Sequence, residues 1–479
     1  MKLRYLYYSI PLLLWLLQAI YTFHTTNQLR PDEIDPIKDV LPFANRALSS
    51  AGGSNVSIYA ALLILYETFG FDLYMVKYMR LALELISLFC LSFLLKKYLG
   101  EKKAVLPLII IGLSPTVLFW PTTASSWGMD IQQFPIVLFL IDLFNPKIKW
   151  TYFTGLILSW VFAMISWLSY PTFVFYLPFL VWFQIRKLSN LSHLSYLTIC
   201  LVSFLLPLLL TFIYIERRDI LFYDPRYETG LFRAGGKFLL DSDQFAANLA
   251  GIFTNLFVDA TSFMFEIKVV EFSHILPIAT FIFCLILPFK YLKVVGVKPI
   301  VFWCFITIIL NIILSGLTLD GSGLPGGRRN TPIIVSFYVL LSLSWYLIWK
   351  FPTGIKNICL TVIGVLLIHH IIAYPINLEF ISQPSPWREQ TWYSMEGTPQ
   401  ASVNKLLDTL TKEDLFLDCE KMFPDNCHYL SEYSDIYNIL VLSCTYNELN
   451  CHQIKGRYHG ETEYQTLNYD MFAAVDWFK

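Results

Sequence analysis

The chain has 479 residues, of which 56% are hydrophobic and 15% are charged, and its formal net charge is −1. A soluble globular protein carries roughly 25% charged residues, so this composition excludes an ordinary soluble domain and indicates an integral membrane protein. The sequence has no basic stripe and no nucleic-acid-binding motif, which excludes nucleic acid as a partner.

The first apolar segment, 5–22, follows a positively charged start formed by Lys2 and Arg4. A cleaved signal peptide is the alternative interpretation of such a start. The apolar run is closer to a full span of ~20 residues than to a short signal core, and no small-residue cleavage pattern follows it. We therefore expect an uncleaved first helix.

Apolar windows of ~20 residues predict an all-α membrane domain of about eleven transmembrane helices. They lie at 5–22, 77–95, 104–121, 131–144, 150–167, 171–185, 194–215, 273–290, 299–317, 332–349 and 357–376. The segment 57–66 is also apolar but too short to span, so we expect an amphipathic helix there, on the membrane surface in the first outside loop.

Lys and Arg occur in every even-numbered connection between these helices, for example at Lys96 and Lys103, and are scarcer in the alternate connections. Basic residues mark the cytoplasmic side of a membrane protein. The pattern predicts a cytoplasmic N-terminus, and the odd number of helices then predicts an extracytoplasmic C-terminus. The expected localisation is the inner or plasma membrane, crossed many times.

The composition changes near residue 377, where Ser, Pro, Tyr and charged residues become frequent and no segment could span. We expect a transmembrane domain over 1–376 and a small soluble domain, α/β or mixed, over 377–479. The second region holds Cys419, Cys427, Cys444 and Cys451. An even number of cysteines outside the membrane favours disulfides, and we predict the pairs Cys419–Cys427 and Cys444–Cys451 among three connectivities. A zinc site is the alternative, but the spacings do not match the usual short zinc motifs.

Two adjacent carboxylates, Asp32 and Glu33, follow the first helix in the stretch Arg-Pro-Asp-Glu-Ile-Asp. Ionised groups close to a bilayer mark functional sites more often than chance. Transfer of a sugar to an acceptor needs a carboxylate within hydrogen-bond reach of the nucleophile, to accept its proton. The alternative is a solvated loop, because Pro and Asp are also common in turns and at helix starts.

A second group of charged residues is predicted on the outside face. Arg328 and Arg329 follow two glycines, and arginine with close backbone approach suits a phosphate group; a turn that contacts lipid headgroups is the alternative. Asp130 opens the fourth predicted helix, where an acid stabilises the helix dipole or adds a carboxylate to the same cavity as Asp32. Arg80 begins the second predicted helix, where snorkelling toward the membrane edge competes with phosphate contact.

Glu84 stands four residues after Arg80, a spacing at which the two side chains can pair.

The order of these charged and apolar features along the chain resembles the C-type glycosyltransferases of the protein O-mannosyltransferase and aminoarabinose-transferase kind. The resemblance covers about residues 1–215 and consists of the Asp-Glu pair after helix one, the segment Ser57–Gly70, Arg80 in the run Lys77–Glu84, Leu113-Ser114-Pro115, and Asp130. Arg329-Asn330-Thr331-Pro332 also looks like an Arg-x-x-Pro found before a later helix of that family.

The resemblance implies a fold like that of those enzymes, a polyprenyl-phosphate-linked sugar as donor, and an inverting displacement outside the cytoplasm. It implies that Asp32 and Glu33 are catalytic and that Asp130 helps to position an acceptor or a metal. It also implies that Arg80, Arg328 and Arg329 bind the lipid phosphate. The sequence departs from the family at Ser54–Ser57, where a His-Pro-Pro-like motif is usual, and the second loop lacks the basic residue that often accompanies its acid.

We therefore predict a membrane glycosyltransferase whose acceptor is a glycan, a lipid or a protein, with a divalent metal ion as an optional cofactor. A lipid or polysaccharide transporter or flippase is the alternative, but such proteins place polar groups at the middle of the bilayer, and here the acids lie in outside loops. A third hypothesis is a membrane-anchored binding or assembly protein that acts through its C-terminal domain.

Overall fold

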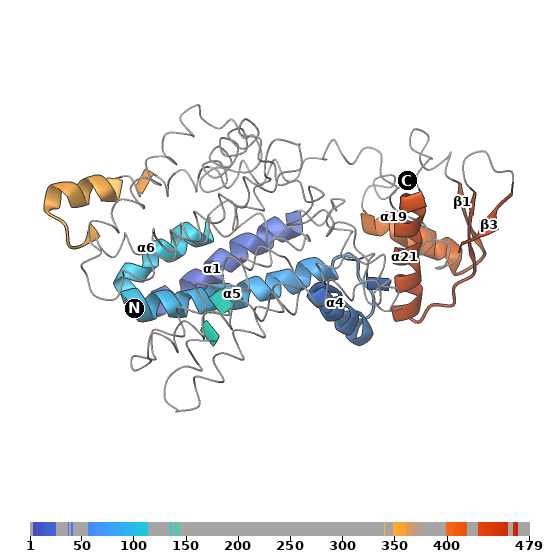
Figure 1. Cartoon of the computed structure of the whole chain (residues 1–479), viewed down its shortest axis with the longest axis horizontal. Helices are drawn as coiled ribbons and strands as arrows, with labels where there is room; N and C mark the ends of the chain where they lie inside the picture. The colour runs from blue at the N-terminus through green and yellow to red at the C-terminus, as the bar shows by residue number, and fades with distance from the viewer. Residues whose placement is uncertain are drawn as a thin grey trace, which may run out of the picture.

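The structure is a computed structural model that describes residues 3–24, 56–113, 399–418, 430–457 and 463–467 (Figure 1), with shorter pieces at 37, 40–41, 135–136, 139–140, 143, 340, 348–361, 364–365, 368 and 372. Most of the predicted helices from 131–144 to 332–349 lie outside these residues. The longer described segments outside 348–361 form two packed units: a group of three helices and a mixed α/β unit that includes the short helix α4.

The helices α1 (Leu3–His24), α5 (Met75–Leu99) and α6 (Glu101–Gly112) occur where the sequence predicts its first three spans. α1 and α5 are antiparallel, because residues early in α1 contact residues late in α5. The Tyr7 hydroxyl donates to the Ser92 carbonyl at 2.7 Å, and the Trp15 indole N–H donates to the Leu81 carbonyl at 2.9 Å. Each bond joins a side chain of α1 to the backbone of α5.

α6 folds back along the other two helices after a sharp turn at Gly100. Gly100 has φ +81°, a conformation that suits glycine and separates α5 from α6. A small apolar core then joins all three helices through Leu14, Leu88 and Leu108. Gly112 lets α6 approach α1 closely, since a Cβ at that position would overlap the side chain of Leu14.

Within the described part of the chain, one helix, Met75–Lys97, is long and apolar enough to cross a membrane.

α4 (Val56–Phe69) is the short apolar helix that the sequence predicts at 57–66. Tyr59, Leu62 and Tyr66 are completely buried and are spaced at i, i+3 and i+7, which places them on one face. Ile64 and Phe69 are 62% and 72% exposed. α4 therefore packs through one side and leaves large apolar side chains on another.

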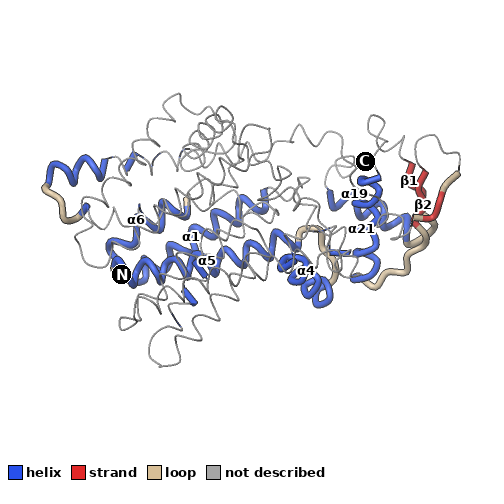
Figure 2. The backbone as a smooth tube through the Cα atoms, in the orientation of Figure 1, coloured by secondary structure: helices blue, strands red, loops and turns tan. Residues whose placement is uncertain are grey.

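The C-terminal described residues form a three-stranded sheet with two helices. The elements are α19 (Pro399–Leu410), β1 (Leu415–Asp418), α21 (Leu430–Tyr446), β2 (Ile454–Arg457) and β3 (Gln465–Thr466). The strand order is β1-β2-β3, with β1 and β2 parallel and β2 and β3 antiparallel (Figure 2). Parallel strands need a crossover connection, and α21 provides it between β1 and β2.

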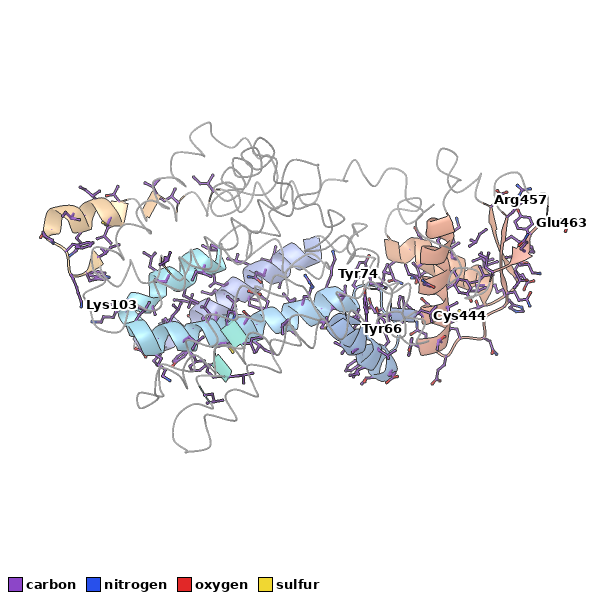
Figure 3. All side chains as sticks on the ribbon, in the orientation of Figure 1. Tyr66, Tyr74, Lys103, Cys444, Arg457 and Glu463 are labelled. Carbon is purple, nitrogen blue, oxygen red and sulfur yellow. A yellow bond between two sulfur atoms is a disulfide. The ribbon has the colours of Figure 1, made fainter. Side chains whose placement is uncertain are left out.

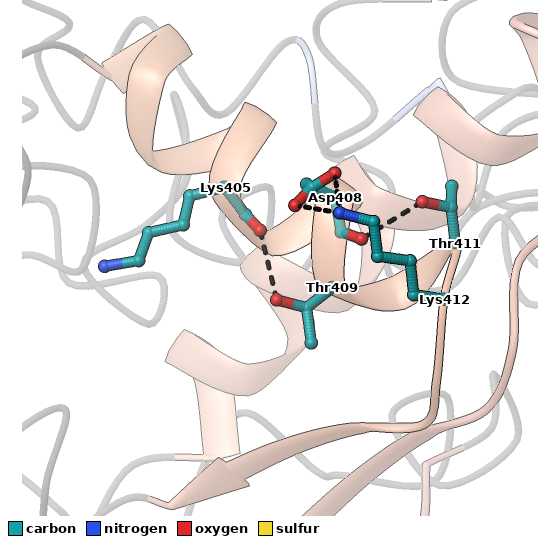
Figure 4. Close-up of polar contacts among 5 residues, drawn as sticks. All are labelled: Lys405, Asp408, Thr409, Thr411 and Lys412. Carbon is teal, nitrogen blue, oxygen red and sulfur yellow. Dashed lines mark hydrogen bonds and ion pairs between the residues drawn. The ribbon is translucent and has the colours of Figure 1, made fainter.

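The C-terminal end of α19 is stabilised by local polar contacts at the surface (Figure 4). The Lys412 ammonium pairs with the Asp408 carboxylate at 2.6 Å, and the Thr411 hydroxyl donates to the Asp408 carbonyl at 3.1 Å. A cation beside the last turn of a helix also interacts favourably with the helix dipole. Both charges are well exposed, so this pair adds little to stability.

The two ends of the described structure carry different parts of the chain (Figure 1). The start of α1 and the α5–α6 turn lie together at one end, where the Lys96 ammonium pairs with the Glu101 carboxylate at 2.7 Å. The α/β unit, including α4, lies at the other end of α5. The regions assigned by sequence to opposite sides of a membrane thus lie at opposite ends of α5.

Candidate functional site

The end of α5 nearest α4 carries three buried ionisable side chains. Lys77, Arg80 and Glu84 are 1%, 0% and 2% exposed. Their spacing, three and then four residues, places them on one face of the helix. Burial of charged groups is costly unless partners compensate them, so a buried group of this kind has a structural or a functional role.

The third residue of this group contacts α1. The Gln18 side chain is 1% exposed and donates through Nε2 to Glu84 Oε1 at 3.0 Å. Gln18 lies six residues before the end of α1 at His24, so this contact joins the last turns of α1 to the first turns of α5. The polar group therefore lies where α1 leads into the first predicted outside loop.

We call Lys77 and Arg80 the cation pair. A snorkelling side chain keeps its charged head in water, whereas both members of the cation pair are buried within the protein. Snorkelling toward water therefore does not describe them. An arginine with a lysine one turn away is a chemically suitable partner for a phosphate group, because guanidinium offers two parallel donors and ammonium a compact charge.

The turn that precedes α5 is held by two side chains. The Asp72 carboxylate accepts the backbone N–H of Tyr74 at 2.7 Å, an Asx turn directly before the helix. One residue earlier, Asn447 of the α/β unit accepts the N–H of Phe71 at 2.7 Å through Oδ1 and donates through Nδ2 to the Phe71 carbonyl at 3.3 Å. We call this pair of bonds the clamp.

A single buried cluster surrounds the clamp and joins the two parts of the chain. We call it the shared core. Its members from the first predicted outside loop and the start of α5 are Ile37, Val40, Leu41, Tyr59, Leu62, Tyr66, Phe71, Leu73 and Val76. Its members from the C-terminal region are Val403, Leu410, Leu415, Leu417, Ile436, Ile439, Leu440, Leu442, Ile454 and Leu467. Val76, next to Lys77, thus packs in the same core as the sheet.

Tyr66 lies at the centre of this contact and, in Figure 3, on the side of α4 that is nearest Cys444. Its ring is 5.0 Å from the ring of Phe71 and 5.9 Å from that of Tyr446, measured between centroids. Burial raises the pKa of Tyr66 far above its ordinary value, and the nearby Asp72 charge adds to the rise. Tyr66 therefore stays neutral and serves the core through packing.

The structure contains a disulfide between Cys444 and Cys451, with Cα atoms 6.1 Å apart. This pair was predicted from the sequence. The other predicted pair, Cys419 with Cys427, lies outside the described residues. The disulfide closes the loop that carries Asn447, so it lies beside the clamp.

Most of the predicted site residues lie outside the described part of the chain: Asp32, Glu33, Asp130, Arg328 and Arg329. Among the described residues no group of three or more His, Cys, Asp or Glu could hold a metal ion. Asp130, which the resemblance assigns to positioning an acceptor or a metal, is not among those residues. Arg80 is the predicted phosphate-binding residue whose surroundings the structure describes.

Sequence reasoning missed two residues of this region. Gln18 is a polar residue inside an otherwise apolar span, a signal that could have identified it. Asn447 had no such signal, because its partner Phe71 is 376 residues away along the chain.

No family model matches the chain, and no curated protein matches it either. Among solved structures, it is similar to the crystal structure of ArnT from Cupriavidus metallidurans bound to undecaprenyl phosphate, with 12% identity and a TM-score of 0.49. The similarity covers 91% of this chain and 84% of that chain. At this identity and TM-score, the similarity assigns neither fold nor activity.

Proposed function

We propose that this chain is an integral membrane glycosyltransferase that moves a sugar from a polyprenyl-phosphate donor to an acceptor on the extracytoplasmic side. The observation that carries the proposal is the placement of the cation pair, Lys77 and Arg80, on one face of α5 at the end that follows the first predicted outside loop. A polyprenyl-phosphate donor presents its phosphate at the membrane surface, where such a pair could bind it.

The predicted base lies in the segment that begins at this same end. Asp32 and Glu33 belong to the stretch between His24, the last residue of α1, and Ile37 of the shared core. A chain advances at most ~3.6 Å per residue, so covalent geometry alone keeps Glu33 within about 14 Å of Ile37. Three residues of sequence thus separate the predicted base from the shared core, which also contains Val76.

In the proposed reaction, an acceptor oxygen or nitrogen attacks the anomeric carbon while the bond from that carbon to the phosphate oxygen breaks. The acceptor proton passes to Asp32 or Glu33, and polyprenyl phosphate leaves with the bonding electron pair. Arg80 and Lys77 stabilise the charge that grows on the phosphate. A single displacement inverts the configuration at the anomeric carbon. Retention would need a second carboxylate as nucleophile, and Asp32 and Glu33 are poorly placed for that because they are adjacent in the sequence.

The test compares Arg80→Ala and Arg80→Lys in the purified full chain. We expect Arg80→Ala to lower kcat/KM for sugar transfer by about 10²-fold, because removal of one preorganised hydrogen-bond donor destabilises a charged transition state by about that factor. Arg80→Lys keeps the charge but loses the bidentate geometry, so its loss should be smaller. Lys102→Ala is the matched control, since Lys102 is exposed at the opposite end of α5. Full transfer by Arg80→Ala would reject the phosphate role.

The base is tested separately with Asp32→Asn and Glu33→Gln. We expect transfer to be lost in at least one of them while binding of polyprenyl monophosphate persists, because a base acts on the acceptor and not on the phosphate. Transfer that survives both changes would exclude these residues as the base. A flippase would instead move the lipid across vesicles without forming a new glycoside.

A further inference from the structure

The turn between α4 and α5 connects the α/β unit to the cation pair, and Asn447 makes the connection. We infer that Asn447 is a positioning residue: by clamping Phe71, it fixes the start of α5 and thereby the location of Lys77 and Arg80. The functional half of this inference rests on the proposed function, since it concerns the phosphate-binding side chains of that reaction.

The backbone on both sides of the clamp is held in place by other contacts, so the clamp joins two fixed segments. On one side, the N–H of Asn447 donates to the Ser443 carbonyl at 3.1 Å at the end of α21. Glu448 follows with φ +52°, a left-handed residue of the kind that closes helices, and the Cys444–Cys451 disulfide encloses both residues.

On the other side, the turn begins where α4 ends. The N–H of Gly70 donates to the Tyr66 carbonyl at 2.9 Å, and Gly70 has φ +83°. A Cβ on Gly70 would lie 2.7 Å from Asn447 Oδ1, so only glycine leaves room for the amide. Phe71 itself is 8% exposed, and loss of the clamp would leave its backbone N–H and carbonyl without these side-chain partners.

The path from the clamp to the cation pair is short. Phe71 is clamped, Asp72 forms the Asx turn, and Met75 begins α5, with its N–H donating to the Asp72 carbonyl at 3.1 Å. Lys77 and Arg80 then lie in the first two turns of the helix. A rigid helix transmits a shift of its first turn directly to side chains so close to its start.

The experiment uses the full chain with Asn447→Ala, Asn447→Asp and, as matched control, Asn450→Ala, an exposed asparagine of the same disulfide loop. Amide hydrogen exchange over 68–76 is the first readout. We expect Asn447→Ala to speed exchange at Phe71 by about tenfold, the effect of one lost net hydrogen bond at the upper end of its range. Asn447→Asp keeps the acceptor and loses the donor, so its exchange rate at Phe71 should lie between those of the unmodified chain and Asn447→Ala. Asn450→Ala should exchange at the rate of the unmodified chain.

The second readout is the affinity for polyprenyl monophosphate, with the uncharged polyprenol as the comparison. We expect Asn447→Ala to weaken binding of the monophosphate by about threefold to tenfold, as one misplaced hydrogen-bonding group would, and to leave binding of the polyprenol unchanged. A double-mutant cycle with Gly70→Ala should be non-additive, because the added methyl group clashes with the Asn447 amide that Asn447→Ala removes.

Unchanged hydrogen exchange over 68–76 in Asn447→Ala would overturn the inference. An equal loss of monophosphate affinity in Asn447→Ala and Asn450→Ala would also overturn it. If exchange rises as expected but the unmodified chain binds monophosphate and polyprenol equally, the clamp is confirmed and the proposed function is rejected. The two failures are therefore distinguishable.

Discussion

Tyr66 fills the shared core with its ring, but its hydroxyl has no hydrogen-bond partner within the described part of the structure. A buried donor without a partner carries a desolvation cost, whereas the ring contributes packing.

We therefore expect Tyr66→Phe to leave the melting midpoint of the full chain unchanged or to raise it. Tyr66→Ala should destabilise by roughly 3–5 kcal/mol, the usual cost of deleting a buried aromatic ring. Thermal denaturation of the two variants in detergent checks this. If the melting midpoint of Tyr66→Phe fell as far as that of Tyr66→Ala, the hydroxyl would have to make a strongly stabilising contact.

Asp414 has the opposite character, because a specific partner stabilises its charged form. The Lys455 ammonium lies 2.6 Å from the Asp414 carboxylate, and the N–H of Gln453 donates to the same carboxylate at 3.1 Å. The hydrogen bond from Lys455, followed by that from Gln453, lowers the pKa of Asp414 below its ordinary value.

A carboxylate with a lowered pKa in the folded state adds stability above its ordinary pKa, and this addition is lost as the pH falls through the lowered value. The difference in melting midpoint between the unmodified chain and Asp414→Asn should therefore be present at pH 7 and shrink below about pH 4. Thermal denaturation across this range measures it. A difference that stays constant with pH would show that the Asp414 charge contributes nothing.

At the scale of elements, α4 presents two faces with different partners. Tyr59, Leu62 and Tyr66 pack into the shared core, while Ile64 and Phe69 remain exposed. A helix with one apolar face buried in protein and large apolar side chains on another suits a position at a membrane surface.

Cysteine substitutions at Ile64 and Phe69 test this orientation. A dye attached at either position should be quenched by spin-labelled lipid, because those side chains would enter the interface between headgroups and acyl chains. Lys412→Cys is the control, since Lys412 is exposed on the α/β unit. Equal, weak quenching at all three positions would place the exposed face of α4 in water.

At the scale of the whole molecule, the members of the shared core between Ile37 and Val76 and those between Val403 and Leu467 must lie on the same side of any membrane that the chain crosses. An even number of spans must then separate these regions, and the sequence predicts ten, from 77–95 to 357–376. Lys103, in the first turn of α6, lies at the opposite end of α5 from the strand region near Glu463 (Figure 3).

We expect a membrane-impermeant thiol reagent to label Glu463→Cys in intact cells and to leave Lys102→Cys unlabelled until the membrane is permeabilised. The basic residues around Lys102 favour the cytoplasmic side. The unmodified chain gives the background from its own cysteines. Labelling of both positions in intact cells would contradict the predicted topology.

Local patterns in the sequence were sufficient for several of these elements. The apolar run 57–66 predicted α4, the run 77–95 predicted α5, and the even number of cysteines in the C-terminal region predicted disulfides, of which Cys444–Cys451 is present. Period and spacing carry that information within one segment. The sequence did not predict that Glu84 accepts a hydrogen bond from Gln18, because an i+4 partner on its own helix, Arg80, was the nearer candidate.

The shared core and the clamp could not be predicted for a related reason. Gly70, Phe71 and Asn447 each look like ordinary turn or loop residues in their own segments. Their role depends on packing between parts of the chain that are hundreds of residues apart, and hydrophobic packing is not directional enough to reveal its partner from one side.

The shared core also has a consequence for biosynthesis. A ribosome completes residues 37–76 long before it reaches 403–467, so the first half of this core must wait, with apolar surface uncovered, until nearly all of the protein has been translated. A copy that inserted with one span too few or too many would keep the two halves on opposite sides of the bilayer. Such a copy could never seal that surface, which would leave it recognisable to quality-control proteases.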